Sequence, residues 1–166
     1  MLAATMAGGL ARPLTIACAI GAGLVAGVYF AFSTFVMRGL RDIPQPAGMA
    51  AMQSINRAAP NPLFVVALVG TGLGCAVLAV VAGTRWSDPA APWALGGSLL
   101  YVVSLLLTIG YHIPRNDALD GIDATAPGAA ERWQQYLAEW VPWNHVRTLT
   151  ALTGAVALTV SLTRRA

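Results

Sequence analysis

The stretch LTIACAIGAGLVAGVYFAFSTFVM, residues 14–37, carries no charged residue over its whole length. A helix needs about 20 apolar residues to cross the roughly 30 Å hydrocarbon core of a bilayer. Three further runs share this character: residues 62–84, 93–111 and 148–163. The last is short, but Arg147 and Arg164 at its ends can extend their charged groups to the membrane surface. Because backbone polar groups in lipid must be paired internally, the runs predict four transmembrane helices with both termini on one side.

The composition supports a membrane protein. Hydrophobic residues make up 57% of the chain and charged residues only 10%, against roughly 25% in soluble domains. All ten basic residues are arginines, which excludes a lysine Schiff base, and the net charge of +3 is too scattered to indicate nucleic-acid binding. The composition therefore predicts the lipid bilayer as a partner.

The connections between the runs differ in kind. In the first, Met49, Met52 and Ile55 recur at helical spacing, which predicts a short interfacial helix. In the third, aromatic residues recur every three or four positions along one face of an amphipathic helix: Trp133, Tyr136, Trp140 and Trp143. Such a face either anchors a helix at the membrane surface or lines a site for a flat aromatic molecule. The prediction is a single all-α domain over residues 1–166, an integral membrane four-helix bundle.

Glycines are spaced for close helix packing in two of the predicted spans. Gly23 and Gly27 form one G-x-x-x-G pattern, and Gly70 and Gly74 form another. Small residues at this spacing let helix backbones approach each other in lipid. The pattern predicts a tight bundle and is compatible with a homo-oligomer.

Polar side chains gather at one membrane face, where spans one and three end and spans two and four begin. The candidates for a site there are Asn56, Asn61, His112, Asn116, Trp140, Trp143, Asn144, His145 and Arg147. The opposite face offers Arg12, Arg85, Asp88, Arg164 and Arg165, without histidine or asparagine. This asymmetry predicts one functional face.

Local patterns suggest how these groups are presented. Pro114 disfavours helical geometry at Ile113, so span three is expected to end or kink there. The hydroxyls of Ser33 and Thr34 are expected to bond the backbone of their own helix, as is usual in membrane helices. The two histidines suit proton transfer or metal binding. With Asp117 they make up a set that suits non-haem iron, and as a pair they suit haem, although no tight ligand spacing is present.

Four segments together resemble the anthrone-oxygenase-like membrane proteins: GVYFAFSTFVM (27–37), AMQSINRAAPNPLF (51–64), HIPRNDAL (112–119) and W..Y...W..WNHVRT (133–148). This family comprises small four-helix membrane proteins, most of them bacterial and of unknown function. The resemblance implies a bacterial cell membrane as the location and an apolar small molecule as a partner. Some members are linked to the oxidation of anthrones to anthraquinones by dioxygen, without flavin or metal. The resemblance implies roles for Asn56, Asn61, Pro114, Asn116, Trp143, Asn144, His145 and Arg147. Many members have asparagine at the position of His112, a departure that bears on the substrate.

The leading hypothesis is a cofactor-independent oxygenase for an anthrone-like or quinol-like molecule. His145 or His112 would remove a proton. Asn144, Asn116 and Arg147 would stabilise the oxyanion that develops, while Trp140 and Trp143 stack on the ring system. The alternatives are a non-enzymatic membrane protein that binds lipid or a small molecule or acts as a scaffold, and a haem or metal redox protein that uses both histidines.

Overall fold

The computed structural model describes residues 2–164, and the side chains of residues 11–164. All regular elements within that range are helices. In chain order they are α1 (Leu2–Ala31), η1 (Phe32–Val36), α2 (Met37–Asp42), α3 (Gln45–Ala58), α4 (Pro62–Val65), η2 (Val66–Gly70), α5 (Thr71–Gly83), α6 (Ala91–Leu107), η3 (Thr108–His112), α7 (Ile113–Asp120) and α8 (Ala129–Arg164). The three elements labelled η are single π-helical turns.

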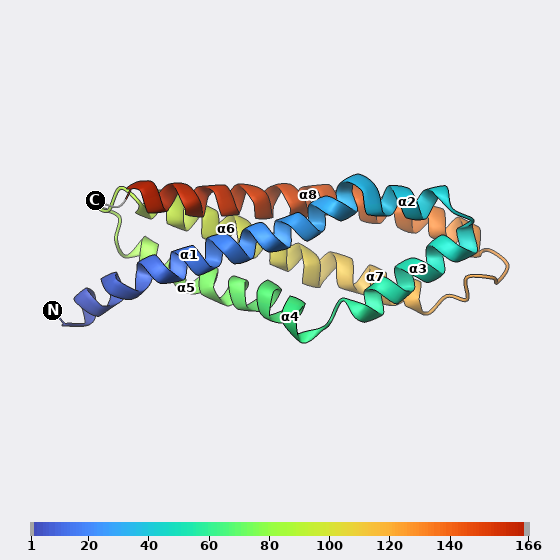
Figure 1. The fold of residues 1–166 in the computed structure, drawn as a ribbon, viewed down its shortest axis with the longest axis horizontal. Helices are drawn as coiled ribbons and strands as arrows, with labels where there is room; N and C mark the ends of the chain where they lie inside the picture. The colour runs from blue at the N-terminus through green and yellow to red at the C-terminus, as the bar shows by residue number, and fades with distance from the viewer. Residues whose placement is uncertain (1, 165–166) are drawn as a thin grey trace.

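Four continuous helical segments run side by side along the long axis of the molecule (Figure 1). They are long and apolar enough to cross a membrane: Ala11–Asp42, Pro62–Gly83, Ala91–Asp120 and Ala129–Arg164. Each contacts two neighbours, in the order α1, α8, α6, α5 and back to α1. Both ends of the described chain lie at the same end of the molecule (Figure 1). The all-α membrane bundle predicted from the charge-free runs is confirmed.

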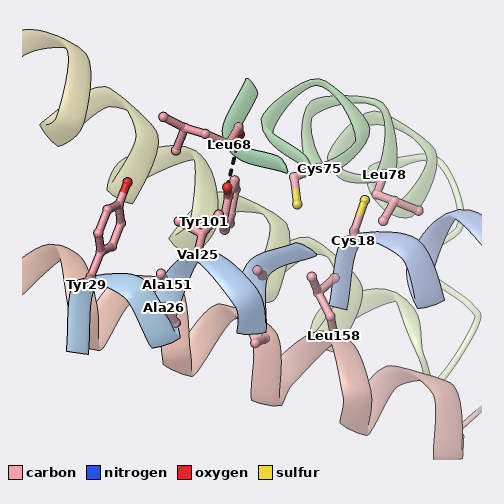
Figure 2. Packing of buried hydrophobic residues seen from close by; sticks show 12 residues of the cluster. Cys18, Val25, Ala26, Tyr29, Leu68, Cys75, Leu78, Tyr101, Ala151 and Leu158 are labelled. Carbon is pink, nitrogen blue, oxygen red and sulfur yellow. Dashed lines mark hydrogen bonds between the residues drawn. The ribbon is translucent and has the colours of Figure 1, made fainter. Parts of the chain in front are cut away.

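The interior of the four segments is an apolar cluster, called here the membrane core. It consists of Cys18, Ala22, Val25, Ala26, Tyr29, Leu68, Cys75, Leu78, Tyr101, Ala151, Ala155 and Leu158 (Figure 2). Cys18 and Cys75 are free thiols that face each other between α1 and α5. Large apolar residues such as Ile20, Leu24 and Val80 point outward. Exposed apolar surface on this scale is unfavourable in water and natural in lipid.

Glycines allow the helix backbones of the membrane core to approach closely. A Cβ atom added at Gly97 on α6 would lie 2.9 Å from the carbonyl oxygen of Gly154 on α8. Gly21 packs in the same manner on Thr71, and Gly74 on Cys18. The predicted pair Gly23 and Gly27 instead lies on the outer surface of α1, with no atom within 4 Å of an added Cβ. The helices therefore do pack closely, as predicted, but mostly at glycines other than those of the predicted patterns.

A second cluster, called here the aromatic core, lies at the end of the molecule remote from the termini. It consists of Met37, Met49, Met52, Leu119, Ala129, Trp133, Tyr136, Leu137 and Trp140. The interfacial helix predicted in the first connection is α3, which packs on α7 and α8. The aromatic helix predicted in the third connection is the first half of α8, and it continues through Pro142 into the fourth span without a break.

Each of the first three segments contains a π-helical turn, where a side chain bonds a carbonyl oxygen. The Thr34 hydroxyl donates to Phe30, the Tyr101 hydroxyl to Leu68 and His112 Nδ1 to Leu107. Turn η3 ends two residues before Pro114, and Ile113 keeps right-handed helical angles of φ −58° and ψ −51°. The expected loss of helical geometry at Ile113 is therefore not found, because the wider turn accommodates the proline.

Candidate functional site

A group of buried polar residues lies between the membrane core and the aromatic core. This polar cluster comprises Tyr29, Ser33, Thr108, His112, Asn144 and Arg147. It joins the end of the first segment, the π turn of the third segment and the middle of α8. Buried polar groups are costly unless they are hydrogen-bonded, so each bond in the cluster must be accounted for.

Asn144 is fully buried and uses both ends of its carboxamide to hold α8 against α1. Its Nδ2 donates to the carbonyl oxygen of Tyr29 at 2.9 Å and to the Ser33 hydroxyl at 2.7 Å. Its Oδ1 accepts from Arg147 Nε at 2.8 Å. Because a carbonyl only accepts and a guanidinium only donates, these partners fix the orientation of the amide. Asn144 thus positions Arg147.

The hydroxyl groups of Ser33 and Thr148 form a ring of hydrogen bonds with Asn144. The Thr148 hydroxyl donates to the Asn144 carbonyl oxygen at 2.7 Å, so it can only accept from Ser33, which lies at 3.1 Å. Ser33 in turn accepts from Asn144 Nδ2. Thr34 bonds its own helix as expected, but Ser33 does not, because its side chain points into the bundle rather than along α1. The expectation for Ser33 is wrong.

Arg147 is only 6% exposed and lies between two aromatic rings. Its guanidinium carbon is 4.0 Å from the centre of the Tyr29 ring and 5.0 Å from that of Trp140. Its Nη1 donates to the Thr108 hydroxyl at 3.4 Å. None of the ion pairs among the described residues includes Arg147. A buried cation without a carboxylate partner is energetically costly, and here two aromatic rings and hydrogen bonds with Asn144 and Thr108 offset that cost.

Thr108 links Arg147 to Tyr29. The Thr108 hydroxyl donates to the carbonyl oxygen of Ser104 at 2.9 Å, so the Tyr29 hydroxyl, 2.8 Å away, must be the donor in their bond. Ser104 donates to the carbonyl oxygen of Arg147 at 3.0 Å. These bonds connect the third segment to α8 and fix the wall around the guanidinium.

His112 is fully buried in the π turn, and one of its nitrogens has no partner. Nδ1 lies 3.2 Å from the carbonyl oxygen of Leu107 and must carry a proton to donate to it. In the neutral ring, Nε2 is then a bare acceptor, and it forms no hydrogen bond with the described residues. The ring lies edge-on to Trp140, with centres 5.1 Å apart, and the charge of Arg147 acts on it.

Trp140 is held in place by Asn116. Asn116 Oδ1 accepts from Trp140 Nε1 and from the Tyr136 hydroxyl, both at 2.8 Å. The Asn56 side chain lies within interaction distance of the Tyr136 hydroxyl. Buried polar atoms without a hydrogen bond are rare, which sets His112 Nε2 apart from the other polar atoms of the cluster.

The remaining candidates lie elsewhere. His145 is exposed on the opposite side of α8 from Asn144 and Arg147. Asn61 is exposed and caps α4, accepting from the Phe64 backbone at 3.0 Å. Trp143 is 41% exposed and packs on Tyr111, with ring centres 5.0 Å apart. The structure therefore brings together His112, Asn116, Trp140, Asn144 and Arg147, with Asn56 at the edge.

The structure also bears on the metal hypothesis. Among the described residues, no group of three or more His, Cys, Asp or Glu side chains comes together. His112, His145 and Asp117 are therefore not gathered into one ligand set. The site has instead an imidazole and a guanidinium around an indole ring.

Tyr29, Ser33 and Thr108 were not predicted as site residues. They are hydroxyl-bearing residues within apolar runs, and Tyr29 and Ser33 lie in the segment GVYFAFSTFVM. A hydroxyl in a membrane helix usually donates its hydrogen bond to a backbone carbonyl of the same helix. The presence of a hydroxyl is therefore only a weak indication of a functional site. Their role follows only from the crossing of α1, α8 and the η3 turn.

Comparison with known proteins identifies the family. The family model described as "Anthrone oxygenase" matches residues 52–157, which is more than half of the chain. The matched range includes the second half of α3 and most of α8, and it contains His112, Asn144 and Arg147. Neither the curated proteins nor the solved structures contain a match. The chain belongs to the anthrone oxygenase family.

Proposed function

We propose that this protein is a membrane-embedded oxygenase of a bacterial cell membrane that acts, without a bound cofactor, on an apolar aromatic molecule of the anthrone or quinol type. The family supports an oxygenase-like function. The observation that carries the finer proposal is the pairing of a buried bare imidazole nitrogen, His112 Nε2, with the buried and unpaired Arg147 cation. Both flank the indole ring of Trp140.

The two groups suit the first step of such a reaction. The methylene hydrogens of an anthrone are acidic because the resulting carbanion delocalises through the rings onto the carbonyl oxygen. His112 Nε2 would accept one of these protons, and the nearby Trp140 carbonyl oxygen could then accept a bond from the new N–H. Arg147 would stabilise the negative charge on the oxygen. None of the ion pairs among the described residues includes Arg147, so no carboxylate competes with the substrate for its guanidinium. Asn144 would hold Arg147 in place.

The reaction balances with dioxygen as the second substrate. The deprotonated anthrone reduces dioxygen and forms a carbon–oxygen bond, giving a hydroperoxide once a proton is returned. The hydroperoxide then loses water, because the second methylene hydrogen leaves and the oxygen–oxygen bond breaks. The methylene carbon becomes a carbonyl, one oxygen atom enters the product and the other leaves as water.

The test compares the two histidines by oxygen uptake with anthrone in detergent. His112→Gln removes the base but keeps a polar side chain, and it should lower turnover by about 10²–10⁴-fold. His145→Gln is the matched control, because this residue is exposed on the other side of α8, and it should keep activity within about twofold. Equal activity of the two variants would assign the base elsewhere.

One observation favours a second candidate, a non-enzymatic protein that binds lipid or a small molecule. Asn144, Ser33 and Thr148 form a closed set of internal hydrogen bonds, as expected of a structural lock between α1 and α8. On this reading His112→Gln would change thermal stability, and no variant or wild-type sample would consume oxygen with anthrone.

A further inference from the structure

The two cysteines of the chain come together inside the membrane core. Cys18 on α1 and Cys75 on α5 are free thiols that lie far apart in the sequence. Their sulfur atoms face each other between the two helices (Figure 2) and lie within interaction distance. Both side chains are buried, with exposed fractions of 2% and 0%. The bundle therefore holds a pair of thiols rather than two isolated apolar cysteines.

The helices that carry the two thiols are in close backbone contact. A Cβ atom added at Gly74, the residue before Cys75, would lie 2.7 Å from Cys18 Sγ. At the same crossing Gly21 of α1 packs on Thr71 of α5. Cys18 therefore reaches the backbone of α5 directly beside Cys75. A disulfide between two helices requires such an approach, because its Cα atoms must lie within about 7 Å of each other.

The thiol pair lies close to the lipid-facing surface of the bundle. Leu14 packs on Gly74 where α1 crosses α5, and both residues are only half-buried. Leu73 and Val77, on either side of Cys75 in the sequence, are exposed. The thiols are therefore covered on this side by residues that are themselves partly exposed to lipid. A reagent that dissolves in the bilayer can approach them, whereas a charged reagent cannot.

The apolar surroundings also determine which chemistry suits the pair. A thiol buried among apolar groups resists ionisation, so reagents that need a thiolate react slowly with it. Two adjacent thiols can instead react without leaving a charge in the membrane core. The buried Ser98 hydroxyl on α6 lies within interaction distance of Cys75 and can hydrogen-bond a polar intermediate there.

We propose that Cys18 and Cys75 form a redox-active pair, which a lipid-soluble hydroperoxide converts into an intramolecular disulfide that cross-links the first segment to the second. One thiol attacks the hydroperoxide, whose oxygen–oxygen bond breaks to give an alcohol and a sulfenic acid. The other thiol displaces water from the sulfenic acid, and the sulfur–sulfur bond forms. The two sulfurs together lose two electrons, which reduce the peroxide, and the hydrogens leave in the alcohol and the water.

The proposal goes beyond the oxygenase and does not depend on it. The cross-link joins two neighbouring segments of the bundle through residues that are distant in the sequence. A disulfide of this kind restricts the unfolded chain, so the oxidised protein should unfold at a higher temperature than the reduced protein.

The test counts free thiols in full-length protein reconstituted in phosphatidylcholine nanodiscs and treated with cumene hydroperoxide. After denaturation, maleimide–polyethylene glycol labels the remaining thiols, and the intact mass is measured. The wild type should lose both thiols together, stay a monomer and lose the mass of two hydrogen atoms, and dithiothreitol should restore both thiols. The Tm measured before denaturation should rise on oxidation.

The matched controls are Cys18→Ser and Cys75→Ser, which each leave one thiol without a partner. Their remaining thiol can gain oxygen but cannot form the intramolecular disulfide, so neither the loss of two hydrogen atoms nor the rise in Tm should occur. Unfolded wild-type chain in sodium dodecyl sulfate shows that the oxidant is active.

Three results would overturn the proposal. The first is that both thiols of the folded wild type stay free under conditions that oxidise the unfolded chain. The second is that the wild type gains oxygen atoms without losing the two hydrogen atoms. The third is that the disulfide joins two molecules, which a dimer on a non-reducing gel would reveal.

Discussion

The membrane core and the aromatic core are packed on different principles. The membrane core consists mostly of small and medium-sized residues, and its helices cross at glycines such as Gly97 and Gly154. The aromatic core is built from large side chains, including Trp133 and Trp140. Lipid provides no hydrophobic drive between helices, so close backbone contact must hold the first region together. The second region can use the burial of large apolar surface from water.

The comparison also explains where the site lies. The polar cluster is at the boundary, where α8 passes from the aromatic core into the membrane core. On the side of the aromatic core, Trp140 supplies a fixed aromatic ring next to Arg147. On the side of the membrane core, Tyr29 supplies a second ring, and its hydroxyl is bonded to Thr108 in the η3 turn. A cation buried here is shielded from water, which strengthens its interaction with any anion that reaches it.

Removing Trp133 should give the largest effect on stability and should separate the two cores. Trp133→Ala leaves a large void in the aromatic core and should lower the free energy of unfolding by about 3–5 kcal/mol. Hydrogen exchange should speed up in α3 and α7, with α5 and α6 still protected. Uniform loss of protection over all helices would show that the two cores unfold as one unit.

Replacing Arg147 should affect activity and stability in opposite directions. Arg147→Met removes a buried cation without a carboxylate partner, so oxygen uptake should fall about a hundredfold while the Tm is unchanged or rises. Arg41→Met, at an exposed arginine, is the control for both measurements. Parallel loss of Tm and activity in Arg147→Met would instead make Arg147 a structural residue.

A smaller effect is expected from one added methyl group in the membrane core. Gly97→Ala places a Cβ 2.9 Å from backbone atoms of α8 and should lower the free energy of unfolding by about 1–3 kcal/mol. Gly23→Ala is the matched control, because nothing lies within 4 Å of its added Cβ. Thermal unfolding in detergent measures both, and equal Tm values would show that the Gly97 crossing tolerates expansion.

The fold could be predicted largely because lipid leaves few alternatives to a helix. The charge-free run of residues 14–37 and its three counterparts predicted the segments, and the spacing of Met49 and Met52 predicted α3. The π turns were not predictable, since no local residue pattern requires them. The continuity of α8 through Pro142 was missed because a proline usually interrupts a helix, whereas here packing on both sides keeps the helix intact.

The site was predictable as a membrane face but not as an arrangement. His112 and His145 are equivalent by composition and by their position at helix ends, yet one is fully buried and the other exposed. One residue corresponds to about 100° around a helix, so the choice between Asn144 and His145 depends on how α8 is rotated. Tertiary packing sets this rotation, through the bond from Asn144 to Tyr29.

That bond has a consequence for biogenesis. A helix that carries an asparagine and an arginine at the start of its apolar run needs other helices to supply partners for these polar groups. Asn144 and Arg147 find their partners on α1 and in the η3 turn, so the last segment to be synthesised depends on the first for its polar bonds. The polar cluster can therefore form only when α1 and the η3 turn are already in place, so it completes the assembly of the bundle.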